Sequence, residues 1–483
     1  MCAGPACVCP FFKKERHLMK TLQQLIDSKS NLVDYFYNDT ISQYHKSRTS
    51  LFATLIAPEY TNWREEQKAW REAAVLFNQS HHMPVLYVKG PDARKLLNYL
   101  SPCSFENLST DRAKQYIACT PRGHHIGDCI LNYYGEQEGF ELISGMPILN
   151  WVRYNGETGG YNVEFKFDPT TPYTADGKRT KFRFQLEGPN ARAILDEVCE
   201  GGWPEIKFFH TAYVTIAGCK VHVLRHGMAG HAGAEISGPF AEMDTVRNAI
   251  LEAGQKHGLL QAGTRTYYST PLEDGWIPYP LPGIYTGEEL RPYREWLTEE
   301  SWEANMQLGG SLYSENIEDY YWTPWALGYE RLVKFDHDFI GREALEAQLK
   351  QPRRVKRSLK WNEEDVMKVF GSQFGDGPMY KAIEMPTSYY GWPQADEIRS
   401  KDGKLIGMSQ YCGYNINERD MISLCGIDED HAEIGTEVIL TWGEVNGGSR
   451  KPHVERHEQT TIRATVSSIP YSKAAQEKFR AVI

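Results

Sequence analysis

The sequence lacks both a long apolar run and a dense basic cluster. Its 483 residues contain no stretch of about eighteen consecutive apolar residues, so we expect no membrane-spanning helix. The longest basic block is Arg353-Arg354-Val355-Lys356-Arg357, and the formal net charge is −10. Because a phosphate backbone attracts concentrated positive charge, these features argue against a nucleic-acid partner.

Cysteine is also sparse. The 10 cysteines are scattered without a Cys-x-x-Cys pair, which is typical of free thiols in a reducing compartment. Cys2, Cys7 and Cys9 could bind a metal, but we expect residues 1–18 to form a disordered tail. This region lacks an apolar segment followed by a cleavage site, so we expect a cytoplasmic protein.

Aromatic residues, by contrast, are abundant. The chain has 28 Tyr, 19 Phe and 12 Trp, and 41% of its residues are apolar. Such a composition argues against disorder and fits a globular enzyme with aromatic-lined cavities. The length predicts about two to four domains, each with its own apolar core.

An internal repeat indicates how these domains are built. The segment Tyr87–Leu97 recurs as Phe184–Leu195, and a weaker copy at Ile236–Phe240 leads into Val246–Leu251. Each copy has alternating strand residues, a Gly-Pro turn and then apolar residues at helical spacing. The repeat therefore predicts related strand-turn-helix modules.

The fold class follows from the segments between and after these modules. Asp128–Tyr134 turns into Phe140–Ile143 as a hairpin, which favours an antiparallel or mixed sheet and hence an α+β protein. Beyond a charged stretch at 346–356, short β runs alternate with Gly-rich turns. We predict two interleaved α+β lobes at 19–345 and a C-terminal β-barrel domain at 358–483.

Two conspicuous patterns are not ligand motifs by spacing. Gly227–Gly233 is glycine-rich but runs into a strand-like segment, so it does not match a dinucleotide-binding loop. His81-His82 and His124-His125 are adjacent pairs that would point to opposite sides of a strand. Neither pair has a recognised metal-ligand spacing, so we expect no metal site.

Several longer motifs occur together and point to one family. They resemble tetrahydrofolate-dependent aryl O-demethylases that act on vanillate or syringate, and the resemblance runs from about Met19 to the end of the chain. The motifs are Asn62–Arg64, Gln79–Met83, Arg225–Gly230, Gly263–Trp276, Ile317–Tyr320, Val333–Gly341 and Val466–Tyr471. The family shares the three-lobed aminomethyltransferase fold of the glycine-cleavage T-protein, in which the lobes surround a folate channel.

The resemblance implies a tetrahydrofolate site. Glu235 matches the carboxylate that grips the pterin ring, whose adjacent N–H groups a carboxylate can accept together. Trp276 matches a tryptophan that covers the flat ring. Asp128 stands where the T-proteins have an Asp-Asp pair, but its neighbour here is Cys129, a departure that argues against aminomethyl transfer.

The resemblance also implies catalytic groups. Tyr267 matches the tyrosine of the aryl demethylases, and a phenol with a pKa of about 10 suits the stabilisation of a departing phenolate. Tyr268 beside it is the alternative for the same role. Cys119, expected to face the channel, is a second candidate for proton transfer or covalent chemistry. Buried inert thiols are the commoner case.

Departures from the family bear on the substrate. Leu51 and Ala53 replace tyrosines of vanillate-type members, and Gly145 replaces an arginine that contacts the substrate. Gln79 and His82 remain to line an aryl pocket. Without a cationic anchor, which is worth about 2–5 kcal/mol, we expect a larger neutral methoxyphenyl or methylenedioxyphenyl compound, such as a sesamin-type lignan.

The resulting hypothesis is one-carbon transfer from an aromatic ether to tetrahydrofolate. The product would be a 5-methyl folate from a methoxy group or a 5,10-methylene folate from a methylenedioxy ring. An amine or sulfonium demethylase on the same fold, and a non-catalytic folate-binding regulator, are the alternatives. The sequence carries no indication of an oligomeric state.

Overall fold

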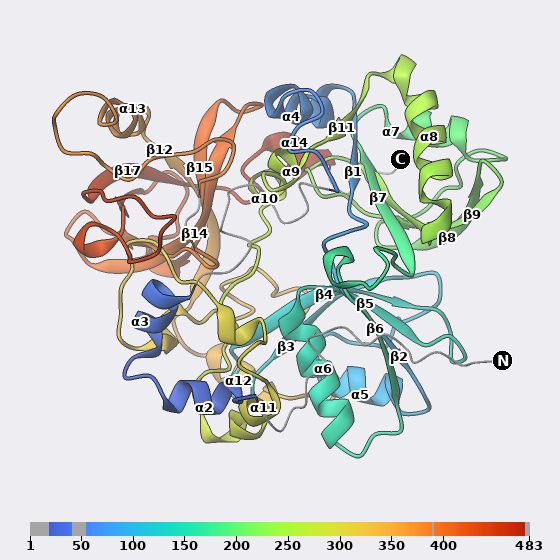
Figure 1. Cartoon of the computed structure of the whole chain (residues 1–483), viewed down its shortest axis with the longest axis horizontal. Helices are drawn as coiled ribbons and strands as arrows, with labels where there is room; N and C mark the ends of the chain where they lie inside the picture. Colours follow the sequence, from blue (N-terminus) through green and yellow to red (C-terminus); the bar gives the residue numbers. More distant parts are fainter. Residues whose placement is uncertain (1–18, 41–54, 389–390, 479–483) are drawn as a thin grey trace.

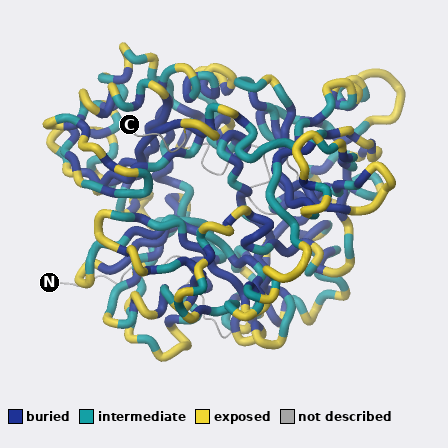
Figure 2. Tube along the Cα trace, turned by 180° about the vertical axis from the view of Figure 1, so that it is seen from behind, coloured by how far each residue is buried: buried dark blue, intermediate teal, exposed yellow. Residues whose placement is uncertain are grey.

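The structure is a computed structural model in which residues 19–40, 55–388 and 391–478 are described. Figure 1 shows two sheets with their helices beside a separate barrel, and one connecting segment between them. Figure 2, seen from behind, shows buried chain in every lobe and exposed chain mainly at the outer turns. Each of the three lobes therefore has buried residues of its own.

The first lobe is a five-stranded sheet made only of antiparallel pairs. Its helices are α5 (Ala93–Tyr99) and α6 (Met146–Thr158), and Pro147 suits the first turn of α6. The strands follow the order β3 (Lys114–Cys119), β4 (His125–Tyr133), β5 (Phe140–Ser144), β2 (Val85–Lys89) and β6 (Glu164–Asp168). The predicted hairpin is β4 and β5.

The second lobe is a six-stranded mixed sheet, in which β1 pairs parallel with β11. The strands follow the order β11 (Leu259–Ala262), β1 (Ala74–Asn78), β7 (Lys181–Glu187), β10 (Gly233–Pro239), β9 (Cys219–Arg225) and β8 (Thr211–Ile216). Its helices are α4 (Trp63–Glu72), α7 (Ala191–Val198) and α8 (Met243–Gly254). Helix α4 begins where the Asn62 side chain accepts hydrogen bonds from the first-turn N–H groups.

The three predicted strand-turn-helix modules are present. They are β2 with α5, β7 with α7, and β10 with α8. The turn glycines Gly90 and Gly188 have φ values of 119° and 124°, and an added Cβ would lie 2.4 Å and 2.7 Å from backbone carbonyl oxygens. Only glycine fits such a turn without strain.

A connecting segment of short helices runs between the sheets and the barrel. It contains α9 (Thr264–Tyr267), α10 (Thr270–Asp274), α11 (Arg291–Trp296) and α12 (Arg342–Gln348). The N-terminal α2 (Leu22–Asp27), α3 (Leu32–Asp34) and π-helix η1 (Tyr35–Asp39) lie near it. The 3-10 turns are η2 (Thr171–Tyr173), η3 (Phe240–Glu242), η4 (Gln255–His257), η5 (Glu288–Leu290), η6 (Glu303–Asn305), η7 (Ile317–Tyr320), η8 (Glu429–His431) and η9 (Val445–Gly447).

The third lobe is a closed barrel, as the sequence predicts. Its strands follow the order β12 (Arg354–Trp361), β15 (Asp420–Asp428), β14 (Leu405–Asn415), β13 (Asp396–Arg399), β16 (Glu437–Trp442) and β17 (Thr460–Ser467). Helix α13 (Glu363–Gly371) packs on it, and α14 (Lys473–Lys478) follows it. The first strand, β12, begins within the stretch that the sequence pattern marks only as charged.

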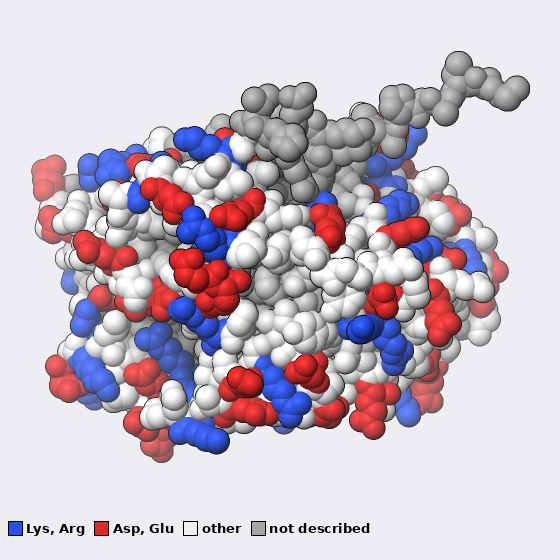
Figure 3. All heavy atoms as spheres, turned by 90° about the horizontal axis from the view of Figure 1, so that it is seen from below, with Lys and Arg blue, Asp and Glu red and all other residues white. Residues whose placement is uncertain are grey.

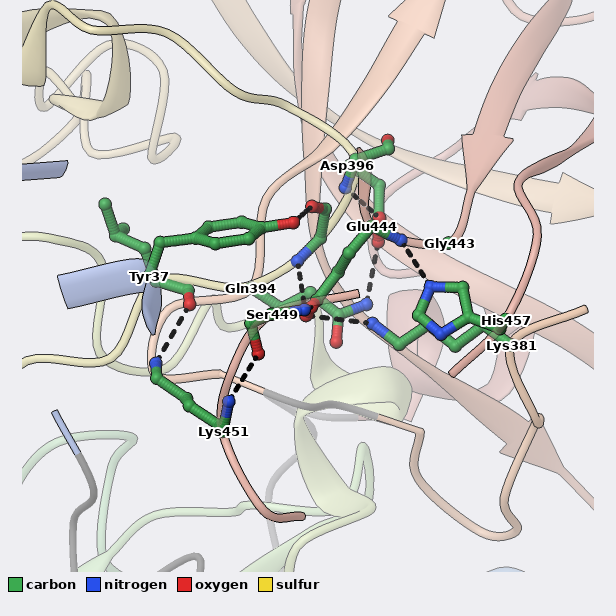
Figure 4. A network of polar contacts seen from close by, with 12 residues as sticks. Tyr37, Lys381, Gln394, Asp396, Gly443, Glu444, Ser449, Lys451 and His457 are labelled. Carbon is green, nitrogen blue, oxygen red and sulfur yellow. Dashed lines mark hydrogen bonds and ion pairs between the residues drawn. The ribbon is translucent and has the colours of Figure 1, made fainter. Parts of the chain in front are cut away.

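A buried polar network joins the barrel to the N-terminal segment (Figure 4). Lys381 and Glu444 form a fully buried ion pair, 3.4 Å apart. Lys451 donates hydrogen bonds to the backbone carbonyls of Phe36 (2.6 Å) and Leu308 (3.2 Å). These contacts fix the barrel against both η1 and the connecting segment.

The surface carries charges of both signs. On the face shown in Figure 3, acidic and basic side chains are interspersed, without a broad region of one sign. Among the described residues, no helix is both long and apolar enough to cross a membrane.

Candidate active site

The side chains of Tyr267 and His82 form the polar centre of the candidate site. The Tyr267 hydroxyl lies 2.8 Å from Nε2 of His82, and the two rings meet edge to face at 4.6 Å. Tyr267 ends the short helix α9, which starts after Gly263, whose Cα packs closely on the backbone of Pro58. His82 follows β1 in the neighbouring turn, so two distant segments meet here.

Both members of this pair are neutral. Burial raises the pKa of Tyr267 well above 10, and nearby Tyr279, Tyr268 and Glu235 add to the effect. Burial also lowers the pKa of His82 to about 3. The pair is therefore a phenol hydrogen-bonded to an uncharged imidazole, and the phenol keeps a proton that it can donate.

Gln79 precedes His82 by three residues and contacts Met228. Its side-chain nitrogen contacts the Met228 sulfur, while its Oε1 is buried without a hydrogen-bond partner among the described residues. An unpaired buried carbonyl is costly, by about 1–3 kcal/mol, and such atoms mark ligand sites. Gln79 is thus placed to accept a hydrogen bond.

The glycine-rich loop 227–233 has a structural role in this arrangement. Its backbone N–H groups at Met228, Ala229 and His231 donate to the buried carboxyl of Glu187 at 2.8, 2.8 and 2.9 Å. The loop therefore wraps an internal carboxyl group, which positions Met228 next to Gln79.

Glu235 is buried on β10 and paired with Arg183 on β7. Arg183 contacts Oε1 of Glu235 and also lies 3.6 Å from Glu141. Burial raises the pKa of Glu235, while the Arg183 charge acts against that rise. The guanidinium thus orients the Glu235 carboxylate, whose charge is close enough to Tyr267 to raise the pKa of the phenol.

A pocket brings together three other predicted residues: Asp128, Gly145 and Trp276 all line it. Its other lining residues are His125, Ile126, Gly127, Ser144, Pro147, Ile148, Tyr279, Pro280 and Trp302. A Cβ added to Gly145 would lie 3.1 Å from the Tyr279 ring, so a larger residue would press on that ring.

Asp128 is held by the indole of Trp276. The Trp276 Nε1–H donates to Oδ2 of Asp128 at 3.2 Å. Burial raises the pKa of Asp128 to about 6, and the hydrogen bond from Trp276 is the largest effect in the opposite direction. The pKa of this carboxyl group therefore lies about two units above its usual value of 3.8.

The chain matches one family model and several known proteins. A family model described as the GCVT N-terminal domain matches residues 35–281. Syringate O-demethylase of Sphingobium sp. (strain NBRC 103272 / SYK-6) is 44% identical over 459 residues, which cover 95% of this chain and 97% of that protein. The chain belongs to the GCVT family.

The chain is also similar to a second curated protein and to a solved structure. Sesamin methylene transferase of Sinomonas sp. (strain No.22) is 29% identical and covers 86% of this chain and 89% of that protein. The crystal structure of glycine cleavage system aminomethyltransferase T from Bartonella henselae aligns with a TM-score of 0.58 at 18% identity, covering 89% and 93% of the two chains. The three-lobed aminomethyltransferase fold is thereby confirmed.

Another predicted site residue, Cys119, pairs with the pocket-lining His125 across β3 and β4 but does not itself line the pocket. Cys119 ends β3 with no solvent exposure and packs in the apolar core, where burial raises the pKa of its thiol. A thiolate is disfavoured there, so we assign it no chemical role. Leu51 lies outside the described residues.

An aromatic cluster of this GCVT protein was not predicted from the sequence. Tyr279 stacks obliquely on Trp392 at 4.7 Å and on Trp302 at 5.8 Å, and Tyr268 meets Trp392 at 6.4 Å. Trp392 comes from the third lobe, more than a hundred residues later in the chain. The abundance of aromatic residues was the only sequence feature that indicated such a cluster.

Proposed function

We propose that this protein transfers a methyl group from a methoxy aromatic compound to tetrahydrofolate and releases a phenol. The observation that carries the proposal is the neutral Tyr267–His82 pair within an aromatic cluster. An aryl ether is cleaved only when its oxygen can leave as a stabilised phenolate. The 44% identity with a syringate O-demethylase supports the same chemistry.

The residues present fit a reduced folate. A pterin is a flat ring with an edge of N–H donors, and the pocket provides the indole of Trp276 and the carboxyl group of Asp128. Glu235, oriented by Arg183, adds a second carboxylate close to Tyr267. We assign these three residues to folate binding. When bound, tetrahydrofolate supplies a ring nitrogen that accepts the one-carbon group.

Tyr267 acts on the leaving oxygen. As the methyl–oxygen bond breaks, the bonding electrons stay on the aryl oxygen, and the Tyr267 O–H donates a stabilising hydrogen bond to it. The tyrosine oxygen then accepts from Nε2–H of His82, which fixes the direction of the phenol O–H. His82 and Gln79 position the aromatic ether.

The substrate class follows from two opposing observations. The relative with 44% identity acts on syringate, a single-ring compound, whereas Gly145 provides no cationic anchor for a carboxylate. The 29% identity with a sesamin methylene transferase keeps a methylenedioxy substrate as the second candidate. We propose a syringate-like methoxybenzene as the first substrate to test.

The first test is anaerobic incubation of the protein with tetrahydrofolate and syringate, vanillate, a dimethoxybenzene or sesamin. Mass spectrometry of the folate should show a 5-methyl product with a methoxy substrate. A 5,10-methylene product from sesamin alone would move the assignment to methylene transfer. No folate product from any of the four would contradict the proposal and leave the amine, sulfonium and regulatory alternatives.

The second test is Tyr267→Phe. We expect kcat to fall by about a hundredfold or more, with tetrahydrofolate affinity unchanged, because the variant loses only the hydrogen-bond donor to the leaving oxygen. Tyr268→Phe tests the competing assignment. If Tyr268→Phe abolished turnover while Tyr267→Phe retained it, the role would belong to Tyr268.

A further inference from the structure

An irregularity in β4 brings His125, a residue of the pocket lining, to the same face of the sheet as Asp128. In a regular strand, residues 125 and 128 would point to opposite faces. The pairing of β3 with β4 shifts register between Ala118 and Cys119, because β4 has one extra residue, Ile126, next to His125. His125 Nε2 therefore lies 3.9 Å from Oδ1 of Asp128, on the same face of the sheet.

The imidazole of His125 has unused hydrogen-bonding capacity. The residue has no solvent exposure, and neither ring nitrogen has a hydrogen-bond partner among the described residues. The ring packs 6.0 Å from Tyr329, and the residue lines the same pocket as Asp128 and Trp276. Burial lowers its pKa to about 3, so the imidazole is neutral and has one donor and one acceptor nitrogen.

We propose that His125 is a ligand-binding residue that acts together with Asp128. The 3.9 Å between their polar atoms is too long for a direct hydrogen bond but suits a ligand group contacting both. Such a group accepts a hydrogen bond from the imidazole N–H and donates one to the carboxylate. A phenolic hydroxyl and a secondary amine of a reduced folate both have this chemistry.

A structural role predicts different behaviour. A buried polar group without a partner destabilises a protein, so replacing this imidazole by an apolar ring of similar size should not reduce stability. A residue that is unfavourable for folding but faces the pocket is explained by ligand binding. Because the ligands named are a folate and an aryl compound, the inference rests on the proposed function.

The experiment compares His125→Phe with His124→Phe in the full-length protein. His124 is the matched control, because its ring packs against Tyr321 and it is not among the residues that line the pocket. Anaerobic calorimetry measures binding of tetrahydrofolate alone and of syringate alone, and thermal unfolding is recorded for each variant. Turnover of the wild-type protein is measured in the same series.

We expect His125→Phe to bind one of the two ligands about tenfold more weakly, as loss of one hydrogen bond predicts, with an unchanged or raised unfolding temperature. Weaker tetrahydrofolate binding assigns His125 to the folate, and weaker syringate binding assigns it to the aryl compound. His125→Gln, which keeps a donor and an acceptor, should recover part of the loss. His124→Phe should match the wild type.

Two results would overturn the inference. His125→Phe could bind both ligands as the wild type does, or it could unfold at a clearly lower temperature, which would make His125 an ordinary core residue. Failure of the proposed function is a separate result. In that case the wild-type protein itself would yield no methylated folate, whatever the variants bind.

Discussion

At the scale of single residues, the hydrogen bond from Trp276 to Asp128 lowers the pKa of the Asp128 carboxyl group. Trp276→Phe removes the indole N–H that stabilises the Asp128 carboxylate, so the pKa of Asp128 should rise above its value of about 6. If the ionised form binds the folate, the acid limb of the profile of kcat/KM against pH moves to higher pH. The measurement is that profile for the variant and the wild type.

The control for this prediction is Trp203→Phe. Trp203 is also a buried indole, but it lies in the core of the six-stranded lobe. Its substitution should leave the acid limb in place. An unchanged acid limb in Trp276→Phe would mean that Asp128 is not the group that titrates.

Some residues of this site could be predicted from the sequence and others could not. Tyr267 and Trp276 stand inside one long motif and Glu235 follows another by five residues, so the resemblance alone identified them. His125 was passed over because strand alternation puts it opposite His124, and a β-bulge is not visible in that pattern. Trp392 was missed because it reaches Tyr279 only through the packing of the third lobe.

At the scale of elements, the loop 227–233 makes stability depend on pH through Glu187. Burial raises the pKa of this carboxyl group from 4.5 to about 7, despite the N–H groups that surround it. Between pH 4.5 and about 7, the folded protein therefore binds more protons at Glu187 than the unfolded chain does. The stability due to protonated Glu187 is fully present below pH 4.5 and is lost as pH rises through about 7.

Glu187→Gln removes this titration. We expect the free energy of unfolding of the wild type, relative to the variant, to decrease as pH rises from 4.5 to about 7 and then to level off. Urea denaturation at a series of pH values measures it. A difference that stays constant across the window would show that Glu187 keeps an ordinary pKa in the fold.

Among the elements, those with strong local patterns were predicted and the others were not. The strand-turn-helix modules follow from Gly-Pro turns and periodic apolar residues, which are local properties. Only the first residues of β12 fall in the stretch that the sequence pattern marks as charged, at 346–356. The place of β12 in the barrel comes from pairing with β15 and β17, both distant in sequence.

At the scale of the whole molecule, the buried ion pair of Lys381 and Glu444 lies where the barrel meets the connecting segment, whose Gly310 N–H donates to Glu444 Oε1 at 3.4 Å. Lys381→Met leaves Glu444 and nearby Asp396 as buried carboxyl groups without this cation. We expect a loss of about 3–5 kcal/mol in the free energy of unfolding, measured by urea denaturation. Lys401→Met, which breaks an exposed pair with Glu437, should cost about 1 kcal/mol or less.

An equal effect of both substitutions would show that the junction contributes no more than a surface contact. The α+β lobes and the barrel were predicted from the sequence, whereas this junction was not. Lys381 and Glu444 are 63 positions apart, and no local pattern relates them.

The contact between Tyr279 and Trp392 has a consequence for recombination among relatives. One ring is encoded before the barrel and the other within it, so a crossover at the start of β12 takes each ring from a different parent. Such a hybrid takes Tyr267 and His82 from one parent and Trp392 from the other. If the two parents have rings of different size at positions 279 and 392, the rings in the hybrid will not pack against each other as they do in either parent.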